Sequence, residues 1–185
     1  MSQFELTILD WIQETMRCTV LDTVMPLISH LGEAGIVWIV LTLVLLCTKR
    51  YRRAGLSCAC ALVLDLLACN IILKPLVGRV RPFDLNPLAP ELLVAPPTDF
   101  SFPSGHTAAS FAATGALYAS GTRLWMPALG LSLLMGLSRL YLYVHYPSDV
   151  LGGLILGTLV GFGGYRLALW LTERFAARQR GGARK

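Results

Sequence analysis

The sequence lacks the patterns that build metal centres and disulfide-stapled domains. Its five cysteines include no CxxC pair and no other spacing typical of a metal site, which argues against a zinc site and a disulfide framework. Only three histidines are present, and no internal repeat is found. The first apolar stretch is interrupted by Glu5, Asp10, Glu14 and Arg17, so it does not predict a cleavable signal peptide.

Long polar segments are also scarce, and this absence indicates the class of protein. Of the 185 residues, 55% are hydrophobic and 15% are charged, and the mean hydropathy is +0.60. Several apolar runs approach the ~20 residues that a membrane helix needs. The net charge of +5 is distributed as membrane topology requires, which argues against a nucleic-acid partner. The composition therefore predicts one integral membrane domain.

The apolar runs predict an all-helical membrane bundle with about six helices that span the bilayer fully or in part. An amphipathic helix at 1–17, apolar with acids between, is expected to lie at the interface. The bundle is expected over 18–171 and a basic cytoplasmic tail over 172–185. The expected segments are a short, tilted or re-entrant one at 18–31, a break at 32–35, and helices at 36–48, 54–73, 106–120, 124–143 and 150–171. Gly153, Gly157 and Gly161 predict close helix packing.

A cation, an imidazole and a carboxylate crowd together between the last two apolar runs. Pro147 suits the first position of a helix, which leaves His145 just outside that helix and Asp149 in its first turn. A carboxylate on one imidazole nitrogen fixes the tautomer and leaves the other nitrogen free as a base or nucleophile. Arg139, one to two turns earlier, offers a planar fork suited to a phosphoryl group.

A second polar cluster closes the long proline-rich loop expected over 74–104. The run Phe-Pro-Ser-Gly-His at 102–106 leads directly into a helix, where backbone N–H groups and the helix dipole form an anion site. His106 would stand at the mouth of that site. Ser104 is open to two interpretations, as an N-cap or as a ligand of the anion. Lys74 and Arg81, at the start of the loop, are expected at the same membrane level.

Together these residues resemble the three-part signature of the type-2 phosphatidic acid phosphatase superfamily of membrane lipid phosphatases. The first part is Lys-Pro-Leu-Val-Gly-Arg-Val-Arg-Pro at 74–82, and the second is Pro-Ser-Gly-His at 103–106. The third is Ser138 and Arg139, then His145 after five residues and Asp149 after three more. Every signature position is present, and the match extends over about 54–171. Vanadium haloperoxidases carry similar motifs but are soluble.

The resemblance implies a role for each matching residue. His145 would attack phosphorus and form a phosphohistidine, Asp149 would orient it, and His106 would protonate the leaving lipid oxygen. The groups expected to hold the phosphoryl oxygens are Lys74, Arg81, Arg139, Ser104 and the N–H of Gly105. Three cations and backbone donors can supply the charge neutralisation that phosphoryl transfer needs. We therefore expect no metal ion and no cofactor.

The motifs recognise phosphate and do not choose among lipids. The expected substrate is a lipid phosphate or pyrophosphate of the surrounding membrane, such as undecaprenyl pyrophosphate, phosphatidylglycerol phosphate or phosphatidic acid. A lipid phosphotransferase of the same family and a small transporter or flippase remain open as alternatives. Because short cytoplasmic loops collect Lys and Arg, the basic turn at 49–53 predicts an active site on the outer face of a bacterial inner membrane.

The resemblance does not assign a role to four further polar residues. Arg79 could contact the phosphate or lipid headgroups. Asp65 and Asn70 lie inside an apolar segment, where an ionisable or polar group often has a function; Asn70 could orient Lys74, and Asp65 could pair with another helix. Asp99 is expected to order the long loop. None of the four is assigned to the catalytic set.

Overall fold

Helices account for all regular structure in the computed structural model, which describes residues 2–87 and 89–182. The α-helices are α1 (Ser2–Met16), α2 (Thr19–Leu31), α3 (Ile36–Cys47), α4 (Arg52–Asp65), α5 (Lys74–Val77), α6 (Pro82–Leu85), α7 (Gly105–Ala119), α8 (Trp125–Tyr141) and α9 (Pro147–Gly182). A 3₁₀ turn, η1 (Glu33–Gly35), connects α2 to α3, and a π-helix, η2 (Leu66–Leu73), connects α4 to α5. The predicted all-α class is confirmed.

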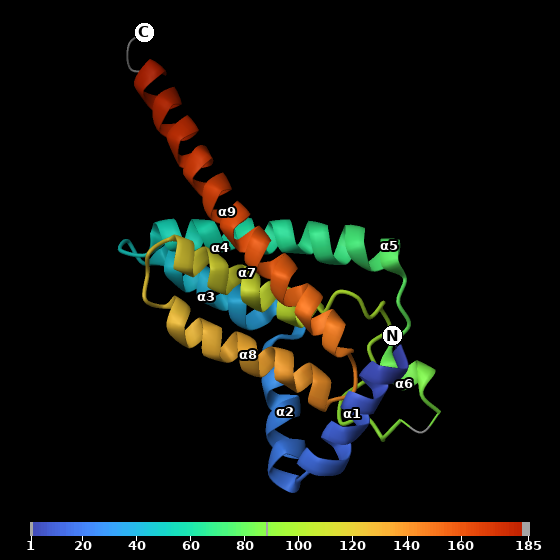
Figure 1. Ribbon diagram of the computed structural model, residues 1–185. Coiled ribbons are helices and arrows are strands. Elements are labelled where there is room, and N and C mark those ends of the chain that lie inside the picture. The colour runs from blue at the N-terminus through green and yellow to red at the C-terminus, as the bar shows by residue number, and fades with distance from the viewer. Residues whose placement is uncertain (1, 88, 183–185) are drawn as a thin grey trace.

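Helix α7 lies at the centre of the bundle, in contact with α3, α4, α8 and α9 (Figure 1). Its sequence explains this position, because a helix rich in Ala, Gly and Ser allows neighbouring backbones to come close. Ten of its residues are buried, and Ala112, Ala113 and Ala116 form a core cluster with Trp38 and Ala61 of the neighbouring helices. Helices α1 and α6 lie at the end of the bundle where α9 begins (Figure 1).

Two helical stretches of the described residues, Arg52–Leu85 and Pro147–Ala177, are long and apolar enough to cross a membrane. The pair Thr19–Leu31 and Glu33–Cys47, bent by 46°, adds a third if it is one broken span. The bend falls at the expected break, where Ala34 and Gly35 have φ angles of +50° and +70°. Helices α7 and α8 have only 15 and 17 residues, roughly 23 and 26 Å at 1.5 Å per residue. By this measure the expectation of about six spans is not confirmed.

Two boundaries differ from those expected. The loop predicted to begin at residue 74 begins later, because helical structure continues through η2 and α5 to Val77. Gly78 ends it with a φ of +59°, a conformation that glycine adopts without a steric cost. At the other end of the chain, α9 continues beyond the expected span to Gly182, so this part of the predicted tail is helical. Residues 183–185 of the tail lie outside the described residues.

The glycines of α9 let its backbone lie directly on α7. A Cβ atom at Gly157 would lie 2.3 Å from the carbonyl oxygen of Ala108, and one at Gly161 would lie 2.7 Å from that of Ala112. At Gly153 the nearest atom would be the carbonyl oxygen of Ser104, at 2.7 Å. No side chain fits at such distances, and a carbonyl group cannot move without its helix. The predicted role of these glycines in packing is confirmed.

We expect Gly157→Ala to destabilise the folded protein by about 1–3 kcal/mol, because an added methyl group overpacks the contact between α7 and α9. The effect is measured as a lower midpoint of thermal unfolding in detergent. Gly163→Ala, on the same helix, is the matched control, since its Cβ would lie 3.6 Å from Cδ1 of Leu64 in an ordinary contact. Equal midpoints for the two variants would contradict the close packing at Gly157.

Candidate active site

A cavity of about 830 Å³ collects most of the residues that the signature predicts. Its polar wall contains Lys74, Arg81, Gly105, His106, Arg139 and His145. These residues come from the end of the α4–η2–α5 stretch, the loop after it, the start of α7, the end of α8 and the loop before α9. The fold therefore brings the three separated motifs to one place at one end of the bundle.

His145 is buried, and its two ring nitrogens have different neighbours. Nε2 lies 3.2 Å from Nη1 of Arg81. Because a guanidinium only donates hydrogen bonds, Nε2 is the nitrogen that carries the lone pair, and this lone pair accepts from Arg81. Nδ1 lies 3.4 Å from Oδ2 of Asp149, within ion-pair range but not aligned as a hydrogen bond. Burial lowers the pKa of His145 to about 3, with Asp149 opposing and the charge of Arg81 assisting. The imidazole is therefore neutral at pH 7.

The loop before α9 turns sharply to present His145. Tyr143 has a φ of +59°, a left-handed conformation that a non-glycine residue holds only when its surroundings enforce it. Its hydroxyl group donates to Asp10, and Asn86 donates to that hydroxyl. Helix α9 then begins at Pro147, as predicted, with Asp149 in its first turn.

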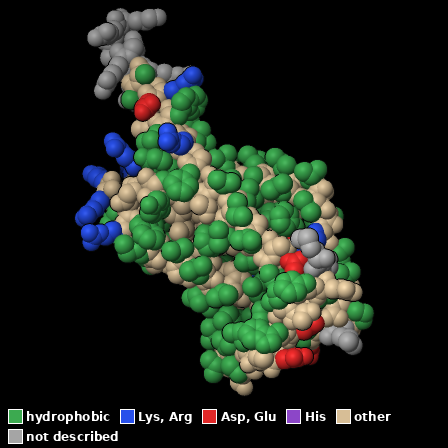
Figure 2. All heavy atoms as spheres, viewed as in Figure 1, with side chains coloured by type: hydrophobic (Ala, Val, Ile, Leu, Met, Phe, Trp, Pro, Cys, Tyr) green, Lys and Arg blue, Asp and Glu red, His purple; other side chains and the backbone are tan. Residues whose placement is uncertain are grey.

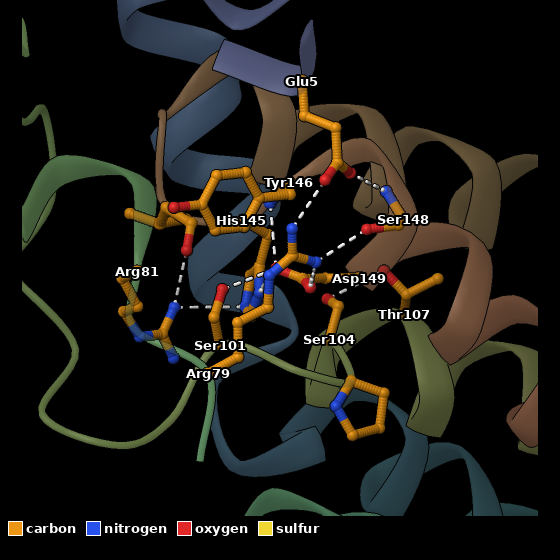
Figure 3. Close-up of polar contacts among 12 residues, drawn as sticks. Glu5, Arg79, Arg81, Ser101, Ser104, Thr107, His145, Tyr146, Ser148 and Asp149 are labelled. Carbon is orange, nitrogen blue, oxygen red and sulfur yellow. Dashed lines mark hydrogen bonds and ion pairs between the residues drawn. The ribbon is translucent and has the colours of Figure 1, made fainter. Parts of the chain in front are cut away.

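Asp149 is fully buried and its carboxylate is held by three donors. Oδ2 accepts hydrogen bonds from the hydroxyl group of Ser101, at 2.5 Å, and from the backbone N–H of Tyr146, at 2.9 Å. Oδ1 accepts from Nη1 of Arg79, at 2.5 Å. Figure 3 shows Ser101 and Arg79 directed at this carboxylate. Sequence reasoning missed Ser101, which no pattern distinguishes from other serines, and left the role of Arg79 open.

Asp99 joins two of the cations. Its Oδ1 accepts a hydrogen bond of 2.5 Å from Arg81, and its Oδ2 accepts one from Lys74. Burial raises the pKa of this carboxyl group, but Lys74 and Arg81 outweigh that effect and lower it to about 2. Arg81 also donates to the backbone carbonyl groups of Asp99 and Val144. Asp99 thus ties the long loop to the cations, as expected for a residue that orders it.

Among the described residues, the Arg139 side chain uses only part of its capacity to donate hydrogen bonds. The side chain is 3% exposed, and its Nη1 donates to the hydroxyl group of Ser29 on α2. Its Nε has no hydrogen-bond partner among the residues that the structure describes. A buried guanidinium donor without a partner is costly, and Arg139 as a residue lines the cavity.

Gly105 and Ser104, two predicted phosphate ligands near the start of α7, differ from each other in their position relative to the cavity. A Cβ atom at Gly105 would lie 3.3 Å from Oδ1 of Asn70 and 3.5 Å from Nζ of Lys74, so the Gly105 backbone faces the cations. Ser104, in contrast, is fully buried, does not line the cavity and accepts a hydrogen bond of 3.0 Å from Thr107. It stands at the N-cap position of α7, as expected, but its side chain makes no capping hydrogen bond.

Asp65 and Asn70 line the same cavity as the cations. The side chains of Asn70 and Lys74 both approach Gly105, and the role of Asn70 in orienting Lys74 stays a prediction. The expected pairing of Asp65 with another helix is not seen, since its buried Oδ1 has no hydrogen-bond partner within the described ranges.

Comparisons with known proteins agree with this arrangement. Residues 53–173 match the PAP2 superfamily. The chain belongs to the PAP2 superfamily. It is 35% identical over 146 residues to an undecaprenyl-diphosphatase of Sulfolobus acidocaldarius, with 77% of this chain and 68% of that relative covered. Membership makes the chain a phosphoric ester hydrolase, and the resemblance drawn from the sequence is confirmed.

Two solved structures share the fold. The crystal structure of a transmembrane PAP2-type phosphatidylglycerolphosphate phosphatase from Bacillus subtilis gives a TM-score of 0.68 at 28% identity and covers 93% of this chain and 86% of that one. The crystal structure of Aquifex aeolicus LpxE gives a TM-score of 0.72 at 27% sequence identity. The match covers 87% of this chain and 94% of that one. Together with the apolar helices, these similarities make the chain an integral membrane protein.

Proposed function

We propose that this protein is a membrane-embedded lipid phosphatase that hydrolyses a lipid phosphate or pyrophosphate without a metal ion, through a phosphohistidine on His145. The observation that carries the proposal is the orientation of His145. Its Nε2 accepts from Arg81 at the cavity wall, and Asp149 stands behind Nδ1. A neutral imidazole that has its lone pair on Nε2 and a carboxylate within ion-pair range of Nδ1 is prepared for nucleophilic attack once the phosphoryl group replaces Arg81 at Nε2.

The reaction has two halves. In the first, the lone pair of Nε2 of His145 forms a bond to phosphorus and the bond from phosphorus to the leaving oxygen breaks. That oxygen belongs to the lipid alcohol of a lipid phosphate or to the lipid phosphate of a pyrophosphate, and His106 gives it a proton. Asp149 stabilises the positive charge that develops on the ring. In the second, water attacks phosphorus, the phosphorus–nitrogen bond breaks, and His106 takes a proton from the water. Inorganic phosphate leaves and the starting enzyme is restored.

The cations around the cavity supply the charge that this chemistry needs. Lys74, Arg81 and Arg139 line one wall, and the N–H of Gly105 adds a donor for the phosphoryl oxygens. Ser104 joins them if its hydroxyl group turns away from Thr107. Preorganised cations and donors of this kind stabilise a transition state without a metal ion or cofactor.

The rest of the cavity suits a lipid chain. Beyond the polar wall its lining includes Ile39, Leu43, Leu46, Leu62 and Leu66. Apolar side chains next to a phosphate site favour a substrate with a hydrocarbon tail. The relatives named as an undecaprenyl-diphosphatase and a phosphatidylglycerophosphatase support undecaprenyl pyrophosphate and phosphatidylglycerol phosphate as candidate substrates, and the sequence motifs add phosphatidic acid as a third.

We expect the purified protein in detergent to release inorganic phosphate from at least one of these three lipids. Turnover should continue in EDTA and should be inhibited by vanadate, which mimics a five-coordinate phosphoryl group. Loss of turnover in EDTA and its return with a divalent cation would contradict metal independence. Transfer of labelled phosphate to an added acceptor lipid, in place of release into water, would identify a phosphotransferase.

We further propose that the helices form about six full or partial spans of a bacterial inner membrane, with the active site at the outer face. The basic segment 49–53, which includes the turn between α3 and α4 and the first residues of α4, contains Lys49, Arg50, Arg52 and Arg53, all exposed. Figure 2 shows Lys and Arg side chains gathered at this end of the molecule and on α9, and Asp and Glu side chains mostly at the opposite end. This asymmetry supports a cytoplasmic basic turn, and Lys74 lies at the far end of the same helical stretch.

A cysteine at Glu91, which is exposed in the long loop, is expected to react with a membrane-impermeant maleimide in intact cells. This cysteine is introduced into a variant in which the five native cysteines have been replaced. The matched control is a cysteine at Arg50 in the basic turn, which should react only after the cells are broken open. The reverse pattern of labelling would place the active site on the cytoplasmic face.

A further inference from the structure

Helix α1 is fixed along the loop that carries His145. It holds this loop through three polar contacts, which are Gln13 Nε2 to the carbonyl oxygen of Tyr141 (2.7 Å), the hydroxyl group of Tyr143 to Asp10 Oδ1 (2.6 Å) and the N–H of Ser148 to Glu5 Oε1 (2.9 Å). Leu9, on the same helix, is fully buried against the apolar side of this loop. The N-terminal helix therefore does more than lie on the surface of the bundle.

Glu5 connects α1 to the carboxylate behind the nucleophile. Its Oε2 accepts a hydrogen bond of 2.6 Å from Nη2 of Arg79, and Nη1 of Arg79 donates to Asp149 Oδ1, at 2.5 Å, and to the hydroxyl group of Ser148, at 2.6 Å. The guanidinium also lies over the ring of Tyr146, 3.9 Å from its centroid. Figure 3 shows Arg79 between Glu5 and Asp149.

The charges of Glu5, Arg79 and Asp149 alternate in sign along this connection. Glu5 is only 7% exposed. Burial raises the pKa of its carboxyl group, but the hydrogen bonds from Ser148 and Arg79 outweigh burial and lower the pKa below its usual value. Glu5 is therefore an anion at neutral pH, and the Arg79 cation lies between it and the Asp149 carboxylate. An arginine fork is suited to this place because its two terminal nitrogens can serve two carboxylates at once.

Arg79 does not line the cavity that contains Lys74, Arg81 and Arg139. Its terminal nitrogens donate to Glu5, Ser148 and Asp149. The hydrogen bonds of Arg79 thus separate it from the cations that face the cavity. Its contacts favour an effect on Asp149 over contact with a phosphoryl group or a lipid headgroup.

We propose that Arg79 and Glu5 are positioning residues for phosphoryl transfer and that helix α1 is therefore part of the active site. Glu5 holds the guanidinium, and the guanidinium holds Oδ1 of Asp149, so that Oδ2 stays directed at Nδ1 of His145. Without the guanidinium, the carboxylate would keep only its Oδ2 contacts with Ser101 and the N–H of Tyr146, and it would orient the ring less firmly as the phosphorus–nitrogen bond forms. This inference rests on the proposed function, because it assigns a task within that reaction.

Two variants remove this connection with little change in size. Arg79→Lys keeps the charge but loses the fork, and Glu5→Gln keeps an acceptor for Ser148 while it loses the charge that holds Arg79. We expect each to lower kcat by about 10- to 100-fold, as is typical for partners that orient a reactive group, with KM unchanged. The matched controls are Arg123→Lys and Glu14→Gln, both at exposed positions, and should match the wild type.

Inhibition separates positioning from binding. In Arg79→Lys, the inhibition constant for vanadate should rise in proportion to the loss of kcat, because vanadate resembles the transition state. Inhibition by inorganic phosphate should not change, since the cations of the cavity are intact. The double variant Glu5→Gln/Arg79→Lys should lose little more than Arg79→Lys alone, because residues that act through one another are not additive.

Three results would overturn the inference. A raised KM and weaker inhibition by phosphate in Arg79→Lys would make Arg79 a ligand of the substrate. An unchanged vanadate constant, with additive losses in the double variant, would reduce both residues to a role in folding. Wild-type kinetics in both single variants would show that Asp149 needs neither residue. A wild-type protein that releases no phosphate from any lipid would instead overturn the proposed function, which is a separate and earlier result.

Discussion

Replacing His145 by alanine is expected to abolish phosphate release, with a loss in kcat of about 10⁴-fold or more, as for the removal of other catalytic nucleophiles. The expectation follows from the contact between Arg81 and Nε2 of His145, which shows that Nε2 carries the lone pair that would attack phosphorus. Without the imidazole no phosphorus–nitrogen bond can form, and the cations alone hold the phosphoryl group without attacking it. The measurement is release of inorganic phosphate from a lipid phosphate in detergent.

The sequence provides a matched control for this variant. His30 is exposed and pairs with Glu33 through Nδ1 at 3.1 Å, and it also lines the cavity. His30→Ala removes an imidazole from the same cavity without touching the proposed nucleophile, so it should retain most of the activity. Wild-type turnover in His145→Ala, at equal thermal stability, would remove His145 from the role of nucleophile.

His106→Ala is expected to lower kcat by about 10²- to 10⁴-fold on a lipid phosphate, the usual contribution of a general acid. A lipid alkoxide is a poor leaving group and needs the proton, whereas p-nitrophenolate leaves without one. The loss on p-nitrophenyl phosphate should therefore be much smaller. Lys74, Arg81 and Arg139 line the cavity with His106, and an anionic substrate bound among these cations favours the protonated imidazole that the acid role requires.

Arg139→Ala distinguishes the two kinds of contribution. Arg139 is expected to hold the transferred phosphoryl group, which is the same in both substrates, so its removal should slow both by the same factor. The comparison of His106→Ala with Arg139→Ala on the two substrates thus separates proton transfer from binding. Equal losses of His106→Ala on both leaving groups would rule out His106 as the acid.

The sequence predicted the parts of the structure that depend on local chemistry. A helix begins at Pro147 because proline favours the first helical position. The spacing of Gly157 and Gly161 predicted close packing because only glycine leaves space for a neighbouring backbone. The motifs predicted most residues of the polar wall, since each motif lies at the end of a helix and these ends meet in the cavity.

The remaining features depend on contacts between distant parts of the chain. Glu5 is 143 residues from Ser148, and in the sequence it is one acid among several on an amphipathic helix. Ser101 and Arg79 became visible only with the carboxylate that both contact. Helices α7 and α8 are shorter than a bilayer requires, which hydropathy over long apolar runs does not reveal. The hydroxyl group of Ser104 accepts a hydrogen bond from Thr107, and the motif alone does not predict this orientation.

The stereochemical course at phosphorus tests the central claim most directly. The substrate is a lipid phosphorothioate whose phosphorus is made chiral by oxygen isotopes, hydrolysed in water enriched in a third isotope. A phosphohistidine on His145 requires two in-line displacements, each with inversion, so the account predicts overall retention of configuration. Overall inversion would mean that water attacks the lipid phosphate directly, and it would contradict a covalent intermediate.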